Sequence, residues 1–301
     1  MKVFLNDPVA PSAVERLKRH VELVDNFEHP EELDAIIVRQ QYCTADVIRK
    51  ATKCKIIQQH GVGLDRIDTE AAKEAGIPVR NTPGTNARSV AEYTVAMMLD
   101  LSRKVSLINE KTREGRLPSF GMPETVGVEL CSKKLGLVGS GHIASEVAQI
   151  AHDGFRMEIF CFNPHRSPEQ IGALGMRPVS ELRELFRICD YVSLHCLLTA
   201  ESYHMVNAEV LRDANPHLIL INTARGGLID EPALYDALCG KKIAAAGLDV
   251  FEEQPPSVNN PLLKLDNFLA GMHVAGSTEE ALERTGHAAV DAVFSALGIE
   301  E

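Results

Sequence analysis

The chain has 301 residues, enough for roughly two domains of about 150 residues each. Its composition, 45% hydrophobic and 24% charged, is typical of a globular protein and excludes a disordered or fibrous chain. The formal net charge of −11 and the lack of a lysine or arginine block argue against a nucleic-acid partner. No apolar run approaches the roughly 18 residues of a membrane helix, so no membrane partner is expected.

The seven cysteines indicate a reducing compartment. They are odd in number and lack a paired C-x-x-C spacing, as is typical of core thiols in a cytoplasmic protein. The N-terminus turns polar at 6–8, before the apolar core of a signal peptide could form. We therefore expect a cytoplasmic protein without a metal site.

Apolar runs rich in valine and isoleucine alternate with helical patterns along the chain. In the first part the predicted strands are 2–5, 21–24, 35–38, 55–58 and 77–79, and the predicted helices include 44–51, capped by Thr44, and 69–75, closed by Gly76. A continuous helical pattern then runs from about Asn86 to Arg113, and the stretch 115–127 after it is predicted as a loop.

The second part repeats the alternation. Its predicted strands are 135–139, 157–162, 191–195, 218–222, 243–249 and 267–270, and its predicted helices are 141–153, 180–189, 207–214, 230–239 (ended by Gly240) and 277–297. This alternation predicts an α/β fold with parallel sheets covered by helices on both faces.

Residues 139–144 read Gly-Ser-Gly-His-Ile-Ala, directly after a predicted strand and directly before a predicted helix. Gly139 permits a tight turn, Gly141 lets a pyrophosphate approach the backbone, and Ala144 is small enough for helix and strand to pack closely. The N–H groups of the helix N-terminus would face the phosphates. Within a βαβ unit, this pattern predicts a dinucleotide site.

About 20 residues further on, at the end of the next strand, NAD enzymes place an acid that binds the ribose. This chain has Asn163 there, and Arg166 follows three residues later. Arg166 could pair with the 2′-phosphate of NADP, or Asn163 could merely turn the loop while Arg166 stays solvated. NAD and NADP both remain open.

At this point the chain resembles the D-isomer-specific 2-hydroxyacid dehydrogenase family, which includes phosphoglycerate dehydrogenases and glyoxylate and hydroxypyruvate reductases. The resemblance covers almost the whole length. It rests on GVELCSKKLGLVGSGHIA (127–144), QHGVGLDRID (59–68), NTPGTNARSVAEYTVAMML (81–99), HCLLT (195–199), NTARGGLIDEPAL (222–234), AGLDVFEEQP (246–255) and HVAGST (273–278).

The resemblance implies two flavodoxin- or Rossmann-like domains with parallel sheets, the cofactor domain inserted into the substrate domain, and an active site between them. Residues 1–96 and 279–301 would form the substrate domain, and 97–278 the dinucleotide-binding domain. It also implies a homodimer formed through the cofactor domain, with the helix at 86–113 as its contact. A purely intramolecular role for that helix is the alternative.

The same resemblance implies the roles of individual residues. The implied cofactor contacts are His142 and Ile143 at the pyrophosphate, Asn163 at the ribose, His195, Cys196 and Leu197 along the adenosine half, Thr223, Ala224 and Arg225 beside the nicotinamide, Asp249 at the carboxamide, and His273 to Gly276 along the ring. The backbone of Val62 and Gly63 would receive the substrate carboxylate, together with Arg225.

The residue types suit hydride transfer between a small 2-keto acid and a D-2-hydroxy acid. Hydride addition leaves an alkoxide that needs a proton, which His273 can supply near neutral pH, and in oxidation the same imidazole is the base. The planar guanidinium of Arg225 matches a carboxylate and an adjacent carbonyl oxygen. Which 2-keto acid is used is not readable from the sequence, since the residues facing its substituent lie in loops such as 38–40 and 115–126.

The chain departs from the family at position 254, where Gln254 replaces the glutamate that usually holds the histidine. An amide can orient an imidazole but lacks the attraction of a carboxylate for imidazolium. We therefore expect His273 to have a lower pKa than its family counterparts, unless Glu253 takes the glutamate's place.

Two other functions remain as alternatives. Formate dehydrogenases of the same superfamily also carry glutamine at this position, but their formate-contacting asparagine aligns with Lys104 here. Corepressors of this fold sense NAD(H) without catalysis, but Arg225 and His273 are intact in this chain.

Overall fold

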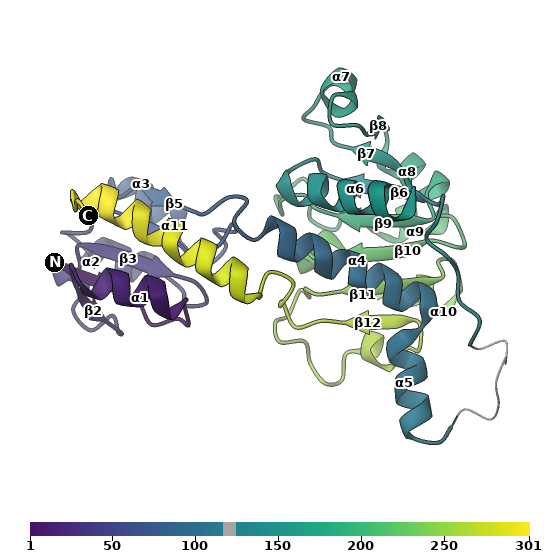
Figure 1. The fold of residues 1–301 in the computed structure, drawn as a ribbon, viewed down its shortest axis with the longest axis horizontal. Coiled ribbons are helices and arrows are strands. Elements are labelled where there is room, and N and C mark those ends of the chain that lie inside the picture. The colour runs from purple at the N-terminus through teal and green to yellow at the C-terminus, as the bar shows by residue number, and fades with distance from the viewer. Residues whose placement is uncertain (117–124) are drawn as a thin grey trace. The chain divides into compact units, whose positions relative to one another are not determined.

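The computed structural model describes residues 1–116 and 125–301, and the predicted loop at 115–127 falls largely outside these ranges. The chain divides into two compact units (Figure 1). The first unit comprises residues 1–86 and 277–301, and the second comprises 87–276. No helix in the described ranges combines the length and the apolar character that a membrane crossing requires.

The first unit is built on a five-stranded parallel sheet in the order β2-β1-β3-β4-β5. Its strands are β1 (Lys2–Phe4), β2 (Glu22–Val24), β3 (Ala35–Val38), β4 (Ile57–Gln59) and β5 (Val79–Arg80). Helices α1 (Pro11–Lys18) and α11 (Glu279–Leu297) bury their apolar residues on one face of this sheet. On the other face lie α2 (Ala45–Lys50) and α3 (Thr69–Glu74).

The second unit is built on a seven-stranded parallel sheet in the order β12-β11-β10-β9-β6-β7-β8. Its strands are β6 (Lys134–Val138), β7 (Glu158–Phe162), β8 (Arg177–Pro178), β9 (Tyr191–Leu194), β10 (Ile219–Asn222), β11 (Ala245–Leu248) and β12 (Phe268–Ala270). The strand order reverses between β6 and β9, the point at which such sheets bind ligands beyond the carboxyl ends of their strands.

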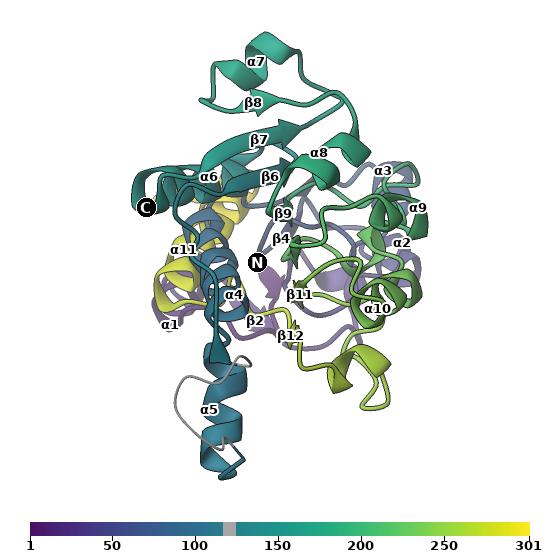
Figure 2. The same cartoon turned by 90° about the vertical axis from the view of Figure 1, so that its right-hand side faces the viewer.

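Helices cover both faces of this second sheet (Figure 2). One face carries α4 (Ala87–Arg103) and α6 (His142–Phe155), which pack against each other. The other face carries α8 (Leu182–Ile188), α9 (Ala208–Arg212) and α10 (Glu231–Cys239). Both sheets are parallel with helices on both faces, so the predicted α/β class is confirmed.

The single helix predicted from Asn86 to Arg113 is wrong. Lys104 adopts a left-handed conformation (φ 56°) and separates α4 from α5 (Val105–Arg113). A left-handed residue cannot continue a right-handed helix. None of the residues of α5 is buried, so packing does not hold the two helices in line.

Smaller differences have local causes. The prediction did not name α1, α7 (Pro168–Gly172) or β8, since short segments give little periodicity. Thr44 stands at the start of α2, but its side chain makes no capping hydrogen bond. The compact units divide at 86/87 and 276/277, because α4 packs along α6, β10 and β11 of the second unit. The substrate and cofactor domains with bounds at 96/97 and 278/279 stay a prediction.

Candidate active site

The glycine turn joins β6 to α6 at the reversal of strand order. Gly139 has φ +100°, and a Cβ there would lie 2.7 Å from the carbonyl oxygen of His195. Gly141 has φ −82°, and a Cβ there would meet nothing within 4 Å. No side chain caps the N-terminus of α6, which begins with His142 and Ile143. The first backbone N–H groups of α6 therefore have no side-chain acceptor. They lie beside Gly141, at which the fold has room for a side chain.

The loop after β7 is tied to this turn. The side-chain amide of Asn163 donates to Ser140 Oγ at 2.8 Å, and its oxygen accepts the backbone N–H of His165 at 3.0 Å. Asn163 therefore does turn the loop, as one of the two interpretations expected. Arg166 is exposed, and no ion pair of its guanidinium occurs within the described residues. The NADP interpretation stays open.

The loop after β9 packs against the turn through its backbone. Nε2 of His195 lies 2.9 Å from Ser193 Oγ, and its Nδ1 is buried without a hydrogen-bond partner among residues 1–116 and 125–301. Burial lowers the pKa of His195 to about 3, so its ring is neutral near pH 7. Cys196 Sγ contacts Met205 Sδ at 3.7 Å, and Leu197 is 72% exposed. The exposed leucine supplies apolar surface beside the turn.

The loop after β10 is held by Asn222, which is fully buried. Its side chain accepts the N–H of Ala224 at 3.0 Å and donates to the carbonyl of Arg225 at 2.8 Å. Thr223 Oγ1 lies 3.0 Å from Thr94 Oγ1 on α4. The guanidinium of Arg225 is half-buried and donates through Nη1 to Ala224. These contacts fix the loop that carries the cationic side chain.

Gln254 and His273 meet at the end of β11. The amide oxygen of Gln254 lies 2.9 Å from Nδ1 of His273, and both side chains are exposed. Because an amide oxygen only accepts, Nδ1 carries a hydrogen and Nε2 is the nitrogen left to exchange a proton. Gln254 itself holds the hydrogen-bonding position beside Nδ1 that the glutamate holds in the family. The hydrogen-bonded pair requires no rearrangement of Glu253.

Asp249 follows β11 and is 1% exposed. Its carbonyl accepts the N–H of His273 at 2.6 Å, and its carboxylate accepts those of Val274 at 3.1 Å and Ala275 at 2.8 Å. Burial raises the pKa of Asp249, and the two N–H groups on its carboxylate oppose that rise. Gly276 ends the second unit directly after this loop.

The parallel strands bring most of the predicted residues to one edge of the second sheet. Loops after β6, β7, β9, β10 and β11 carry them, as do the residues that follow β12. Val62 and Gly63, by contrast, lie after β4 in the first unit, and the carbonyl of Val62 accepts from Asn81 Nδ2 at 2.7 Å. The substrate-facing loop predicted at 115–126 lies mostly outside the described residues.

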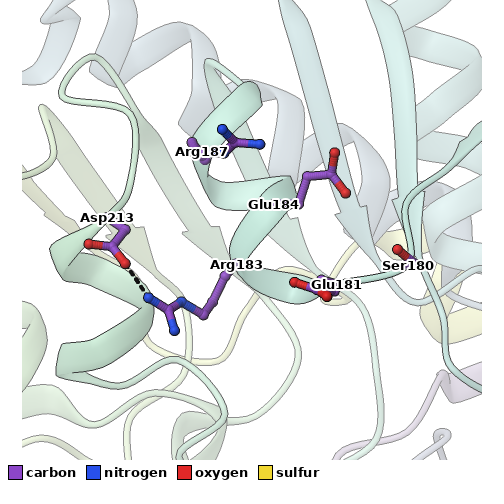
Figure 3. A pocket seen from close by; sticks show the side chains of 6 residues that line it. All are labelled: Ser180, Glu181, Arg183, Glu184, Arg187 and Asp213. Carbon is purple, nitrogen blue, oxygen red and sulfur yellow. Dashed lines mark hydrogen bonds and ion pairs between the residues drawn. The ribbon is translucent and has the colours of Figure 1, made fainter.

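A surface hollow of about 400 Å³ lies elsewhere in the second unit, at α8 and α9 (Figure 3). Arg183 in its wall already pairs with Asp213 and Glu209. None of the predicted site residues lines this hollow. Within the described part of the chain, no three metal-binding side chains gather to hold an ion, and all seven cysteines are free thiols.

Three residues at the site escaped the prediction. Ser140 Oγ accepts a hydrogen bond from Asn163, and Thr94 Oγ1 lies within hydrogen-bond distance of Thr223 Oγ1. The Tyr93 hydroxyl lies close to Gly271: a Cβ added there would be 2.8 Å from it. Tyr93 and Thr94 stand inside the apolar pattern of α4 and were read as helix residues alone. The available sequence signal was a threonine at position 94 on the helix face that also carries Val90, Ala91, Val95 and Met98.

Comparison with known proteins decides the family. The sequence profile described as "D-isomer specific 2-hydroxyacid dehydrogenase, NAD binding domain" matches residues 95–275. A hydroxypyruvate reductase of Thermotoga maritima is 39% identical, over 99% of this chain and 99% of its own length. The chain belongs to the D-isomer-specific 2-hydroxyacid dehydrogenases.

Other members of the family show how its chain length varies. A D-3-phosphoglycerate dehydrogenase of Methanocaldococcus jannaschii is 38% identical over 95% of this chain, which spans 55% of that protein. Among solved structures, D-lactate dehydrogenase of Aquifex aeolicus with NAD and lactic acid has a TM-score of 0.87 at 28% identity, covering 99% of this chain and 96% of its own. Family membership supports hydroxyacid oxidoreduction with a nicotinamide cofactor.

Proposed function

We propose that this dehydrogenase transfers a hydride between a nicotinamide cofactor and a small D-2-hydroxy acid or 2-keto acid. The observation that carries the proposal is the hydrogen bond of 2.9 Å between Gln254 Oε1 and His273 Nδ1. This contact leaves Nε2 of His273 as the proton donor in reduction and the acceptor in oxidation. When bound, the reduced nicotinamide supplies the hydride.

Arg225 is the proposed substrate anchor. Its half-buried guanidinium presents a planar set of donors that suits the carboxylate and carbonyl oxygen of a 2-keto acid. The buried Asn222 holds the Arg225 backbone by accepting from Ala224 and donating to the Arg225 carbonyl. The backbone N–H groups of Val62 and Gly63 are proposed to receive the same carboxylate. Under this proposal the first unit, residues 1–86 and 277–301, is the substrate domain.

The second unit, 87–276, is the proposed cofactor domain. Its residues fit a dinucleotide, because space is open at Gly141 and the N-terminus of α6 lacks a side-chain cap. The proposed cofactor contacts are Gly139, Gly141, His142, Ile143, Asn163, Arg166, His195, Cys196, Leu197, Thr223, Ala224, Arg225, Asp249, His273 and Gly276.

A spectrophotometric assay tests this function. Absorbance at 340 nm is followed with NADH or NADPH and a panel of glyoxylate, hydroxypyruvate, pyruvate and bulkier 2-keto acids. We expect oxidation of the nicotinamide with at least one small keto acid and strong loss of the rate in His273→Asn and Arg225→Gln. Both variants should keep the wild-type unfolding temperature. No turnover with any of these acids would contradict the proposal.

Formate oxidation remains the second enzymatic candidate, because hydride leaves formate without any proton transfer to a base. The amide at position 254 favours it, since formate dehydrogenases carry glutamine there. NAD reduction by formate, unaffected by His273→Asn, would support this alternative. Tight NADH binding without turnover of any substrate would instead support a sensor of the cofactor.

A cytoplasmic homodimer is also proposed. Helix α5 buries none of its residues in the chain, although it carries Val105, Leu107 and Ile108, and Val105 is 58% exposed. A second copy would cover such apolar side chains. Light scattering coupled to gel filtration should give twice the mass of 32.9 kDa. The variant Val105→Glu should shift that mass toward the monomer, and a wild-type monomer would contradict the proposal.

A further inference from the structure

The turn that follows β4 is held by two side chains that follow β5. Thr82 Oγ1 accepts the backbone N–H of Gly61 at 3.0 Å and donates to the Gly61 carbonyl at 3.1 Å. The backbone N–H of Thr82 donates to the same carbonyl at 2.9 Å. Asn81 Nδ2 donates to the carbonyl of Val62 at 2.7 Å. Two successive carbonyls of the turn are therefore bound from the β5 side.

Gly61 gives the turn its direction. Its φ is +136°, a conformation that residues with a side chain rarely adopt. A Cβ there would lie 3.7 Å from Gln59 Nε2, an ordinary contact, so the backbone conformation rather than space requires glycine. Thr82 bonds to both backbone groups of this residue, and its own side chain is buried. Thr82 therefore stabilises the conformation that Gly61 makes possible.

The N–H groups of Val62 and Gly63 are those proposed to receive the substrate carboxylate. Among residues 1–116 and 125–301, no oxygen or nitrogen accepts either of these N–H groups. Both residues are only partly buried. Successive backbone N–H groups can form concave sites that bind anions. The turn is therefore suited to a carboxylate, provided that both N–H groups point the same way.

The hydrogen bonds at the two carbonyls determine where these N–H groups point. In a planar trans peptide, the C=O of one residue and the N–H of the next point in opposite directions, and both peptides are trans. The carbonyl that Thr82 binds shares its peptide with the N–H of Val62. The carbonyl that Asn81 binds shares its peptide with the N–H of Gly63. Each side chain thus fixes the direction of one N–H group.

Neighbouring side chains of β4 make their hydrogen bonds elsewhere. Gln58 Nε2 donates to the Gln59 carbonyl at 2.8 Å, and Gln59 Nε2 lies 3.4 Å from the carbonyls of Arg39 and His60. In the part of the chain that the structure describes, the side-chain bonds to carbonyls 61 and 62 therefore come from the two residues after β5.

The support continues from Thr82 to the last helix. Thr85 Oγ1 donates to the Thr82 carbonyl at 3.0 Å. Because its one hydrogen is used there, Thr85 Oγ1 accepts from Thr285 Oγ1, which lies 2.8 Å away on α11. Arg284 Nε donates to the Thr85 carbonyl at 2.9 Å. Thr285 is 4% exposed, so water does not compete for its hydroxyl.

We propose that Asn81 and Thr82 are positioning residues for substrate binding, which direct the N–H groups of Val62 and Gly63 toward the carboxylate of the 2-keto acid. The hydroxyl of Thr285 extends this support to α11. The inference rests on the proposed role of the turn, which it deepens. Because the carboxylate is common to all 2-keto acids, the effect on binding is the same whatever the substituent.

Steady-state kinetics test the role of the Thr82 hydroxyl. We expect Thr82→Val to raise KM for each keto acid that is turned over by about tenfold, since a misdirected N–H loses part of a charge-assisted hydrogen bond. The value of kcat and the Kd of NADH should change less than about twofold. Thr82→Ser keeps the hydroxyl and should restore KM. An unchanged KM in Thr82→Val, or an equal rise in both variants, would overturn the proposal.

NMR tests the same positioning without a ligand. In the cofactor-free, full-length protein, the backbone amide signals of Val62 and Gly63 should shift in Thr82→Val and, more weakly, in Thr285→Val. Thr285→Ser should return both signals toward the wild type.

The control Val290→Ala removes buried methyl groups from the same helix and should leave these two signals in place. If Thr82→Val does not fold, Thr285→Val carries the test, and unchanged signals in it would refute the inference. Neither signal depends on turnover, so failure of every keto acid in the assay would reject the function and leave the positioning measurable.

Discussion

At the scale of single residues, two properties of His273, the proposed acid–base residue, have different physical origins. The hydrogen bond from Nδ1 to Gln254 fixes which ring nitrogen is free. The ease with which that nitrogen takes a proton depends on nearby charge. An amide provides the first property alone. If His273 is the acid–base residue, a change at position 254 should shift the pH dependence of the reaction without loss of the ring's orientation.

The substitution Gln254→Glu should therefore raise the kinetic pKa of reduction. A carboxylate at this distance stabilises imidazolium, so reduction should persist to a pH about one unit higher. The measurement is kcat/KM for the best keto acid between pH 5 and 10. An unchanged profile would show that position 254 does not set the acidity of His273. Gln149→Glu, on the exposed surface of α6, is the matched control.

Cofactor choice is a second question at this scale. Reversing the charge in Arg166→Glu should weaken NADPH binding about tenfold or more relative to NADH, because a carboxylate would repel the 2′-phosphate. Fluorescence titration with each cofactor measures the ratio of Kd values. Arg187→Glu changes an exposed arginine on α8 and should leave that ratio unchanged. Equal effects of both variants would mean that Arg166 is merely solvated.

At the scale of elements, the two glycines of the turn have different physical reasons. Gly139 is required by the fold, since its φ is +100° and a Cβ would lie 2.7 Å from a carbonyl oxygen. Gly141 is required by neither its conformation nor its neighbours. If the turn binds pyrophosphate, a side chain at 141 would occupy the space that the ligand needs.

The two glycines should therefore respond differently to substitution: a change at Gly139 should affect stability, and a change at Gly141 should affect cofactor binding. Gly139→Ala should lower the free energy of unfolding by about 3 kcal/mol, because it adds both backbone strain and a steric overlap. Gly141→Ala should change it by less than about 1 kcal/mol but weaken NADH binding at least tenfold. Urea unfolding and fluorescence titration measure the two effects. Full NADH affinity in Gly141→Ala would remove the turn from the proposed cofactor site.

The sequence predicted strands well where every residue is apolar and buried. The strands at 35–38 and 219–222 are fully buried runs, so hydrophobicity alone marks them. The break at Lys104 was not predictable, because lysine is an ordinary helix residue and its left-handed backbone has no sequence signal. Motifs indicated the loops of the site. The hydrogen bonds from the backbone of 273–275 to Asp249 could not be predicted, because they depend on the positions in space at which β11 and β12 end.

At the scale of the whole molecule, buried histidines link stability to pH. His60 is 5% exposed, and its burial, with the charge of Arg39, lowers its pKa from 6.5 to about 4. Burial lowers the pKa of His195 from 6.5 to about 3. Both bind a proton more readily when unfolded. Their contribution to stability is therefore present above pH 6.5 and is lost as the pH falls toward the folded values.

Replacing His60 by glutamine should make stability less dependent on pH. Each histidine that charges only on unfolding adds a slope of up to about 1.4 kcal/mol per pH unit below pH 6.5. Urea unfolding at pH 7, 6, 5 and 4.5 should show a shallower decline in His60→Gln. His217→Gln, at an exposed histidine, should follow the wild type. Parallel declines in all three proteins would exclude His60 as a cause of acid instability.

The last helix has a consequence for how the protein is made. Val290, Val293, Phe294 and Leu297 of α11 belong to the same apolar core as residues of β1, β3 and α1. The ribosome therefore completes the second unit, ending at residue 276, before the first unit has its final helix. Helix α1 covers part of one face of the first sheet, and the rest of that face stays uncovered until translation reaches Leu297. The first unit is thus synthesised first but completed last. Until α11 is made, the exposed apolar face of its sheet is the surface that a chaperone would have to cover.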